Sequence, residues 1–332
     1  MKQTHDFDKY LLIPQYSILD SRDDCSVKTK LTNNISLDIP IVSSPMNTVT
    51  ELDMCMSMNR LGGLGVLHRY MPPKDQSEIM QNVAGPRAAS IGVNGDTKER
   101  INNLINVGVS LLVFDVAHGD MKNCHDMVKW IKKEYGKDVG VVTGNIVTVE
   151  AASRYYSSGA DCFRVGIGSG SACSTRTVAG VGYNQLDAIM NIRQNFKEVP
   201  IINDGGIRNS GDLVKVLAAG ADTSFIGSLL AATKESCAEL TKNGYANGGP
   251  YKIYAGMASE YAEKKRIART GESERKIDHI IAPEGEVQFI PYKGESVEAV
   301  ITRLISGLKH GMAYLGAKTI PELWEKAVWS KV

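Results

Sequence analysis

Short apolar runs recur along the chain at a steady interval. They are nearly continuous in hydrophobic residues rather than alternating, which is typical of strands buried on both faces of a parallel sheet. The eight runs read IPIVSSP, GGLGVLHR, RAASIGV, LLVFDVAHG, VGVVTGN, CFRVGIG, PIINDGG and TSFIGS. We therefore expect eight buried strands between residues 39 and 228.

Amphipathic stretches separate many of these runs. Their apolar residues recur at intervals of three and four, as expected for helices with one buried face, and several end in glycine, a helix-stop signal. The clearest read ELDMCMSMNRL, TKERINNLINVG, CHDMVKWIKKEYG, VEAASRYYSSG and SGDLVKVLAAG, with another inside residues 295–327. Strands alternating with helices predict an α/β fold, and eight strands close naturally into a single-domain (β/α)8 barrel, or TIM barrel.

An open, doubly wound sheet is the structural alternative, but no GxGxxG opens a helix after the first strand, which weakens it. Two segments interrupt the alternation, at about residues 166–184 and about residues 233–291. Loops this long inside a compact domain are usually functional, and the loops after the strands build the active site of a barrel. We expect a mobile catalytic loop and a long flap on one face.

Composition narrows the class of protein. The length of 332 residues fits one large barrel. A formal net charge of +1 indicates no binding to nucleic acid or to a membrane surface, and no apolar run reaches the roughly 18 residues of a membrane span. The start, MKQTHDFDKY, lacks the apolar segment of a secretory signal. Six scattered cysteines without a CxxC pair argue against disulfides or structural zinc and favour the cytoplasm.

Glycine-rich turns follow the last two predicted strands. Gly205, Gly206, Gly227 and Ser228 would offer backbone N–H groups and a hydroxyl at helix starts, which suits an anion. A phosphate site in these two loops recurs among such barrels. Asp204 is itself anionic, so it suits the paired hydroxyls of a ribose instead. These residues predict a nucleotide site, the alternative being glycines that only form tight turns.

A reactive thiol is the second chemical feature. The stretch GIGSGSACSTR places Cys173 on the glycine-rich loop. A thiolate is a good nucleophile, and nearby cations or N–H dipoles lower the pKa of a thiol. The glycines also allow carbonyls to converge around a monovalent cation. An isolated cysteine is more often a buried apolar residue, and we interpret the other five in that way: Cys25, Cys55, Cys124, Cys162 and Cys237.

Motifs along nearly the whole chain resemble the inosine monophosphate (IMP) dehydrogenase and guanosine monophosphate (GMP) reductase family. They read SSPMNTVTE, DVAHG, GNIVT, GIGSGSACSTR, GVGYNQLDAI, NDGGIRNSGD, YAGMAS, APEG and PYKG. The resemblance implies a (β/α)8 barrel, a homotetramer, and a cysteine that attacks C2 of a purine nucleoside monophosphate. Many dehydrogenases of the family carry two regulatory domains after the second strand, and LHRYMPPKDQSEIMQNVAGPRAASIGV continues here without them.

The two branches of the family differ after the adduct forms. The reductase expels ammonia from GMP and uses NADPH to give IMP, whereas the dehydrogenase passes hydride to NAD and hydrolyses the adduct with an Arg-Tyr pair on its flap. The flap sequence here has no such pair, because Ile267 follows Arg266 and Thr270 follows Arg269. The stretches DSR at 20–22, DVAHG, GVGY and GMASEYAEKK also resemble the reductase.

Other stretches resemble the dehydrogenase, namely TVAGVG, GGLGVLHRYM and the length of the flap. We predict an NADPH-dependent GMP reductase, with an IMP dehydrogenase lacking the regulatory domains as the alternative. Two lesser alternatives are an FMN-dependent barrel oxidoreductase, suggested by DGGIR and IGS, and an inactive nucleotide-binding regulator.

The resemblance also assigns roles to single residues. Cys173 is the nucleophile, and Thr175 and Glu284 protonate the leaving amine. The substrate contacts are Ser44, Met46, Asp204, Gly205, Gly206, Gly227, Ser228, Gly256, Met257, Ala258, Glu284 and Gly285. The NADPH contacts are Ser21, Arg22, Arg69, Asp115, Val116, Ala117, Ile167 and Gly168. A loop for potassium or another monovalent cation comprises Gly168, Gly170, Cys173 and Arg176, with Gly-Ser-Gly where most members have Gly-Pro-Gly.

Overall fold

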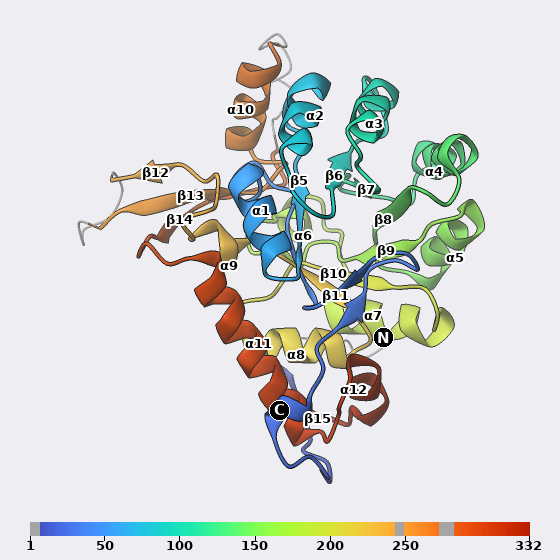
Figure 1. Cartoon of the computed structure of the whole chain (residues 1–332), viewed down its shortest axis with the longest axis vertical. Helices are drawn as coiled ribbons and strands as arrows, with labels where there is room; N and C mark the ends of the chain where they lie inside the picture. Colours follow the sequence, from blue (N-terminus) through green and yellow to red (C-terminus); the bar gives the residue numbers. More distant parts are fainter. Residues whose placement is uncertain (1–6, 243–248, 272–281) are drawn as a thin grey trace.

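A computed structural model of the chain describes residues 7–242, 249–271 and 282–332. Eight parallel strands close into a barrel, in the spatial order β10-β11-β4-β5-β6-β7-β8-β9 (Figure 1). The strands are β4 (Ile41–Ser43), β5 (Leu64–Leu67), β6 (Ala88–Ile91), β7 (Leu111–Phe114), β8 (Gly140–Ile146), β9 (Cys162–Val165), β10 (Ile201–Asp204) and β11 (Thr223–Ile226). Each corresponds to one predicted run, so the (β/α)8 barrel is confirmed.

Helices follow the strands around the barrel. The helices that cover it are α1 (Leu52–Arg60), α2 (Pro73–Gln81), α3 (Thr97–Asn106), α4 (Lys122–Tyr135), α5 (Val149–Ser158), α7 (Gln185–Asn195), α8 (Ser210–Ala218) and α11 (Val297–Tyr314). Shorter helices are α6 (Thr175–Val178), α9 (Ser228–Ala231) and α12 (Ile320–Lys326). Sequence patterns did not predict α2 and α7. Both bury polar residues, including Gln76 in α2 and Arg193 in α7, which obscures an apolar stripe.

Side chains fill the interior of the barrel. Val42, Leu64, Val113, Ile202 and Phe225 belong to one buried cluster contributed by strands around the ring. The hairpin of β2 (Thr29–Lys30) and β3 (Ser36–Leu37) adds Leu31 and Leu37 to this cluster. The hairpin lies at the amino-terminal ends of the barrel strands, where the Thr29 hydroxyl donates to the carbonyl of Asp222, the residue just before β11. The hairpin therefore closes that end, and the opposite end is left for a site.

The predicted flap has secondary structure of its own. β12 (Leu240–Thr241), β13 (Tyr251–Ala255) and β14 (Val287–Pro291) form an antiparallel sheet beside the barrel, and α10 (Glu260–Thr270) lies at the top of Figure 1. Residues 243–248 and 272–281 of the flap lie outside the described residues. β5 and β6 are joined through α2 alone, so no regulatory domain is inserted there. Mobility of the loop and flap remains a prediction.

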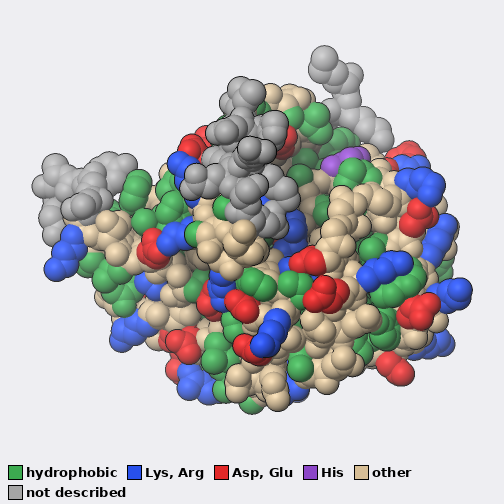
Figure 2. Space-filling model, turned by 90° about the horizontal axis from the view of Figure 1, so that it is seen from above, with side chains coloured by type: hydrophobic (Ala, Val, Ile, Leu, Met, Phe, Trp, Pro, Cys, Tyr) green, Lys and Arg blue, Asp and Glu red, His purple; other side chains and the backbone are tan. Residues whose placement is uncertain are grey.

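The chain ends and the surface complete the fold. β1 (Tyr10–Leu12) pairs with β15 (Trp329–Lys331) and so ties the two ends of the chain together. The face in Figure 2 carries acidic and basic side chains interspersed, in keeping with the small net charge. Among the described residues, no helix has both the length and the apolar character that crossing a membrane requires.

The close approach of α1 to β5 gives a test of the packing. A Cβ atom added to Gly65 would lie 2.4 Å from the Cα of Cys55, a backbone atom that cannot easily move. We expect Gly65→Ala to lower the free energy of unfolding by about 1–3 kcal/mol, as overpacked cores do, measured by urea denaturation. Gly249→Ala is the control, since nothing lies within 4 Å of the position of its Cβ. Equal stability of both variants would contradict the packing described.

Candidate active site

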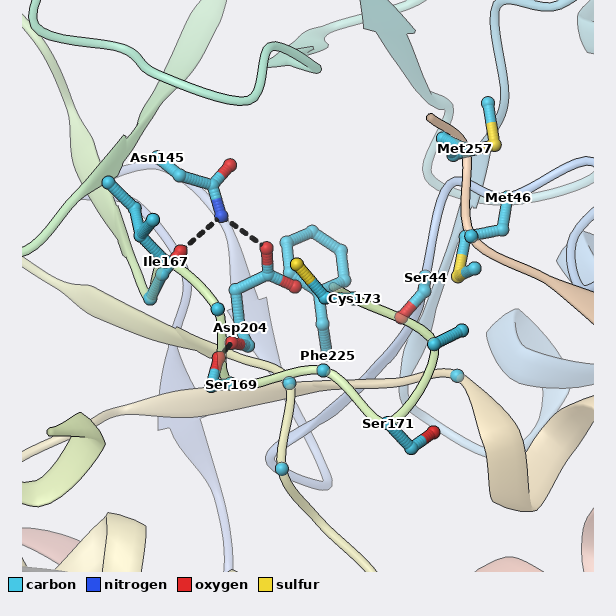
Figure 3. Close-up of a pocket in the computed structure, with 18 of the residues that line it drawn as sticks. Ser44, Met46, Asn145, Ile167, Ser169, Ser171, Cys173, Asp204, Phe225 and Met257 are labelled. Atoms are coloured by element: carbon cyan, nitrogen blue, oxygen red, sulfur yellow. Dashed lines mark hydrogen bonds between the residues drawn. The ribbon is translucent and has the colours of Figure 1, made fainter. Parts of the chain in front are cut away.

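A cavity of about 520 Å³ opens at the carboxyl ends of the barrel strands (Figure 3). It brings together residues from the catalytic loop, the flap and the loops after most strands. The predicted site residues that line it are Ser44, Met46, Arg69, Asp115, Val116, Ala117, Ile167, Gly168, Gly170, Cys173, Asp204, Gly205, Gly206, Gly227, Ser228, Gly256, Met257, Ala258 and Glu284.

Cys173 is part of a short chain of polar groups. Its Sγ lies 3.2 Å from the Thr175 hydroxyl oxygen. The Thr175 hydroxyl donates to Glu284 Oε2 at 2.8 Å. Because that hydroxyl proton is used on the carboxylate, the thiol donates to the threonine oxygen. The geometry supplies a route by which a proton passes between sulfur and carboxylate, so Glu284 can act as base or acid through Thr175.

Backbone hydrogen bonds hold the catalytic loop against the flap. The Ser174 N–H donates to the Glu284 carbonyl at 2.9 Å, and the Glu286 N–H donates to the Ala172 carbonyl at 2.9 Å. Cys173 and Gly285 form an antiparallel β-bridge between these bonds. Gly285 also packs closely on the turn that precedes α10, because a Cβ there would lie 2.7 Å from the Ser259 nitrogen. The thiol and the carboxylate are therefore fixed relative to each other by the main chain.

Two carboxylates on the floor of the cavity share one buried arginine. Arg164, at the end of β9, has a side chain that is only 9% exposed. Its Nε donates to Asp204 Oδ2 at 2.9 Å, and its Nη1 lies 3.6 Å from Asp115 Oδ1. Arg69 holds Asp115 from the other side, with Nε 3.2 Å from Oδ2. Asp204, predicted to bind the ribose, and Asp115, predicted to bind the cofactor, are thus joined through the guanidinium of Arg164.

A register shift between β8 and β9 directs the amide side chain of Asn145 toward the floor of the cavity. The pairing of β8 with β9 shifts between Gly144 and Ile146, and such irregularities turn a side chain out of the ladder. Asn145 consequently points into the cavity, where its Nδ2 donates to the Gly166 carbonyl at 2.7 Å and to Asp204 Oδ2 at 2.5 Å (Figure 3). Asp204 is held by neighbours on two strands and keeps an oxygen toward the cavity.

Hydroxyl groups gather around Gly227 at the predicted phosphate end. A Cβ at Gly227 would lie 2.7 Å from the Tyr254 hydroxyl and 3.4 Å from the Ser44 hydroxyl, so only glycine fits. Burial raises the pKa of Tyr254, which keeps its hydroxyl protonated and able to donate. Ser228 begins α9 directly after this glycine. Several donors without a cation make a site that suits a phosphate.

Some predicted residues lie outside the cavity lining. Thr175 and Gly285 contact Cys173 without lining it, and Arg176 packs on Gly168. Ser21 and Arg22 are farther removed. They line a separate cavity of about 780 Å³ with Lys309 and His310, and Arg22 Nη1 lies 2.8 Å from His310 Nε2. Their contact with the cofactor remains a prediction.

The two arginines in the described part of the flap bind other protein groups. Arg266 pairs with Glu263 on its own helix, with Nε 3.0 Å from Oε2. Arg269 Nη1 donates to Glu51 Oε1 at 2.6 Å, and buried His68 reaches the same oxygen at 3.0 Å. Burial of Glu51 opposes its ionisation, but the hydrogen bonds and charges of His68 and Arg269 outweigh this and lower the pKa of Glu51 to about 2. Neither arginine lines the cavity.

The glycine loop itself brings the predicted cation residues together. The Cys173 N–H donates to the Gly170 carbonyl at 3.1 Å. Arg176 lies against Gly168 and donates to the Tyr183 carbonyl at 2.7 Å. No group of three His, Cys, Asp or Glu side chains suited to a metal ion occurs in the part of the chain that the structure describes. Any cation here would depend on backbone carbonyls, and it remains a prediction.

Sequence reasoning missed several residues of the cavity: Phe7, Asp8, Tyr70, Asn145, Arg164, Ser169, Ser171, Arg208, Phe225 and Tyr254. Arg164 had a detectable signal, because it is the lone charge in the apolar run CFRVGIG and a buried charge must be paired. Asn145 belongs to the quoted GNIVT motif. The register shift that aims Asn145 into the cavity has no comparable sequence signal.

Comparison with known proteins shows the family of the chain. The model of the IMP dehydrogenase / GMP reductase domain matches residues 4–332. The chain belongs to the IMP dehydrogenase / GMP reductase family. It is therefore related to NAD(P)-dependent oxidoreductases of purine nucleotide metabolism, a family that binds purine nucleotides.

Among curated relatives, the inosine-5′-monophosphate dehydrogenase of Cryptosporidium parvum is 38% identical over 98% of this chain and 91% of its own length. The enzyme of the same name from Borreliella burgdorferi is 37% identical over 97% and 92%. That from Aquifex aeolicus is 30% identical over 100% and 94%. These names favour the alternative branch over the predicted reductase.

The shared arginine predicts linked effects on two ligands. Arg164→Lys keeps the positive charge but loses the forked guanidinium that reaches both carboxylates. We expect it to weaken the binding of nucleotide and of nicotinamide cofactor, each by about 10- to 100-fold, the usual effect of losing a hydrogen bond to a charged group. Asn145 contacts Asp204 but not Asp115. Asn145→Ala should therefore weaken the binding of nucleotide alone. Titration calorimetry with each ligand separately measures both. Equal effects of the two variants on both ligands would contradict the arrangement.

Proposed function

We propose that this chain is a GMP reductase, which converts GMP and NADPH to IMP, ammonia and NADP through a covalent adduct on Cys173. The observation that carries the reductase proposal is the lack of an Arg-Tyr dipeptide in the flap sequence. The Cys173–Thr175–Glu284 chain supplies the chemistry, because it puts a proton donor beside the nucleophile. Ammonia is a poor leaving group unless protonated, so expulsion of the C2 amino group requires such a donor.

The same chain serves both proton transfers of the deamination half of the reaction. Glu284 takes the thiol proton through Thr175, and the sulfur attacks C2 of the purine. The proton then returns to the departing amine, the C2–N bond breaks, and hydride from NADPH enters at C2. Cleavage of the C2–S bond releases IMP and the Cys173 thiolate, and a proton from solvent then restores the thiol. The side chains that accept and return the proton are in direct contact.

The direction of the reaction is supported by the flap. Hydrolysis of the adduct, the dehydrogenase step, needs a base for water, which that branch supplies from an Arg-Tyr pair. No Arg-Tyr dipeptide occurs between residues 256 and 291. Arg266 and Arg269 are paired with Glu263 and Glu51, and neither arginine lines the cavity. The described flap therefore offers no arginine to a water at C2.

IMP dehydrogenase is the second candidate, and the names of the three relatives favour it. The Thr175–Glu284 pair could also take a proton from water, so the relay alone does not separate the branches. The family match gives no support to a flavin enzyme, and an intact proton chain is unexpected in an inactive regulator. Preference for NADPH, a bound potassium ion, a homotetramer and a cytoplasmic location remain predictions.

One pair of assays tests the direction. The protein is incubated with GMP and NADPH, then with IMP and NAD, and the absorbance of the reduced nicotinamide is followed with ammonia measured in parallel. We expect NADPH consumption with one ammonia released per turnover, and neither in Cys173→Ala. NADH formation from IMP and NAD, with no ammonia from GMP, would overturn the reductase in favour of the dehydrogenase.

The relay itself has a matched pair of variants. Thr175→Val keeps the shape of the side chain but removes the hydroxyl, so turnover should fall by about 10²- to 10⁴-fold, the usual contribution of an acid–base group. Thr175→Ser keeps the hydroxyl and should retain most of the rate. Affinity for GMP should change little in either variant, because the phosphate and ribose groups lie elsewhere. Similar kcat values for the valine and serine variants would show that the hydroxyl is not used.

A further inference from the structure

The amino-terminal stretch reaches the cavity at its predicted phosphate end. Phe7 and Asp8 both line the cavity, although they precede the first barrel strand by more than thirty positions. The Phe7 ring lies against Gly206, since a Cβ on that glycine would be 2.6 Å from Phe7 Cε2 and 3.2 Å from Cζ. Gly206 is one of the residues whose N–H groups are expected to receive the phosphate.

Polar contacts hold this stretch in place. Asp8 receives two hydrogen bonds from Arg208, with Nη1 3.0 Å from Oδ2 and Nη2 2.6 Å from Oδ1. Lys215 donates to the Phe7 carbonyl. Farther along, the Val332 N–H donates to the Lys9 carbonyl at 2.8 Å. The stretch is therefore anchored at Phe7 itself and at the two residues that follow it.

The nearby cations are already occupied by protein groups. Arg208 also binds Asp212, with Nε 2.9 Å from Oδ2, so one guanidinium serves two carboxylates. Lys215 is bound to a backbone carbonyl. A phosphate at Gly206, Gly227 and Ser228 has backbone and hydroxyl donors, but a second phosphate beyond it would meet an aromatic ring and a carboxylate. The hydrogen bond from Arg208 lowers the pKa of Asp8, so that carboxylate stays negative.

We propose that Phe7 and Asp8 form an end wall that makes the site specific for nucleoside monophosphates over nucleoside diphosphates. Phe7 excludes the second phosphate by its bulk, and Asp8 repels it by its charge. Specificity of this kind is built from a repulsive element as well as an attractive one. The inference rests on the proposed nucleotide site but not on the direction of the reaction.

The test measures binding of GMP, GDP, IMP and IDP by calorimetry to the full-length protein and three variants. Phe7→Ala removes the ring, Asp8→Asn removes the charge, and Tyr16→Ala is the control because it deletes an 89% exposed aromatic ring from the same amino-terminal stretch. Circular dichroism checks that all variants are folded. The quantity compared is the ratio of the diphosphate to the monophosphate dissociation constant, in which any loss of affinity common to both ligands cancels.

We expect the diphosphate-to-monophosphate ratio of dissociation constants to fall about tenfold or more in Phe7→Ala, a change of the size that loss of one steric contact produces. The ratio should fall in Asp8→Asn as well. In the wild-type protein the ratio should also fall as salt is added, because salt screens the repulsion between Asp8 and the second phosphate. Tyr16→Ala should match the wild type.

An unchanged ratio in both Phe7→Ala and Asp8→Asn, with tight binding of GMP or IMP, would overturn the end wall and leave the proposed function standing. Failure of the wild-type protein to bind either monophosphate would instead overturn the nucleotide site, and the inference with it. The two failures are thus distinguishable from the same titrations.

Discussion

One buried guanidinium organises the floor of the cavity. Arg164 lies at the carboxyl end of β9, between Asp204 on β10 and Asp115 after β7. Burying an unpaired charge is costly, so each of these groups requires the others. The closed barrel makes the pairing possible, since it brings the ends of separate strands to a fixed spacing. Two carboxylates can therefore face a ligand without repelling each other or relaxing toward solvent.

A second constraint acts at the thiol. Thr175 and Glu284 are separated by 109 positions in the sequence, yet the β-bridge between Cys173 and Gly285 sets their distance through the main chain. If the two loops were independent, bringing these side chains into contact would require both loops to lose conformational entropy. Here the ladder bonds of Ser174 and Glu286 remove most of that freedom in advance, which is the kind of preorganisation that acid–base catalysis needs.

The barrel could be predicted from sequence because burial on both faces gives each strand a continuous apolar run. The positions of Gly205, Gly206 and Gly227 could also be predicted, since these glycines follow the last two barrel strands; their contact with a phosphate remains a prediction. Arg164 and Asn145 were missed, because their roles depend on which strands are neighbours and on a local register shift. Ser21 and Arg22 matched a short motif, but the fold places them at another cavity. A motif fixes residue types, whereas only tertiary packing fixes where they lie.

The two ends of the cavity are connected to the barrel in different ways. Gly206, Gly227 and Ser228 belong to turns directly attached to β10 and β11, so the phosphate end is as fixed as the barrel. Glu284 belongs to the flap and reaches the thiol only while the bonds between the loop and the flap persist. Breaking those bonds would separate the Glu284 carboxyl group from the sulfur without touching the turns after β10 and β11. In the proposed function, nucleotide binding and proton transfer would therefore depend on different parts of the chain.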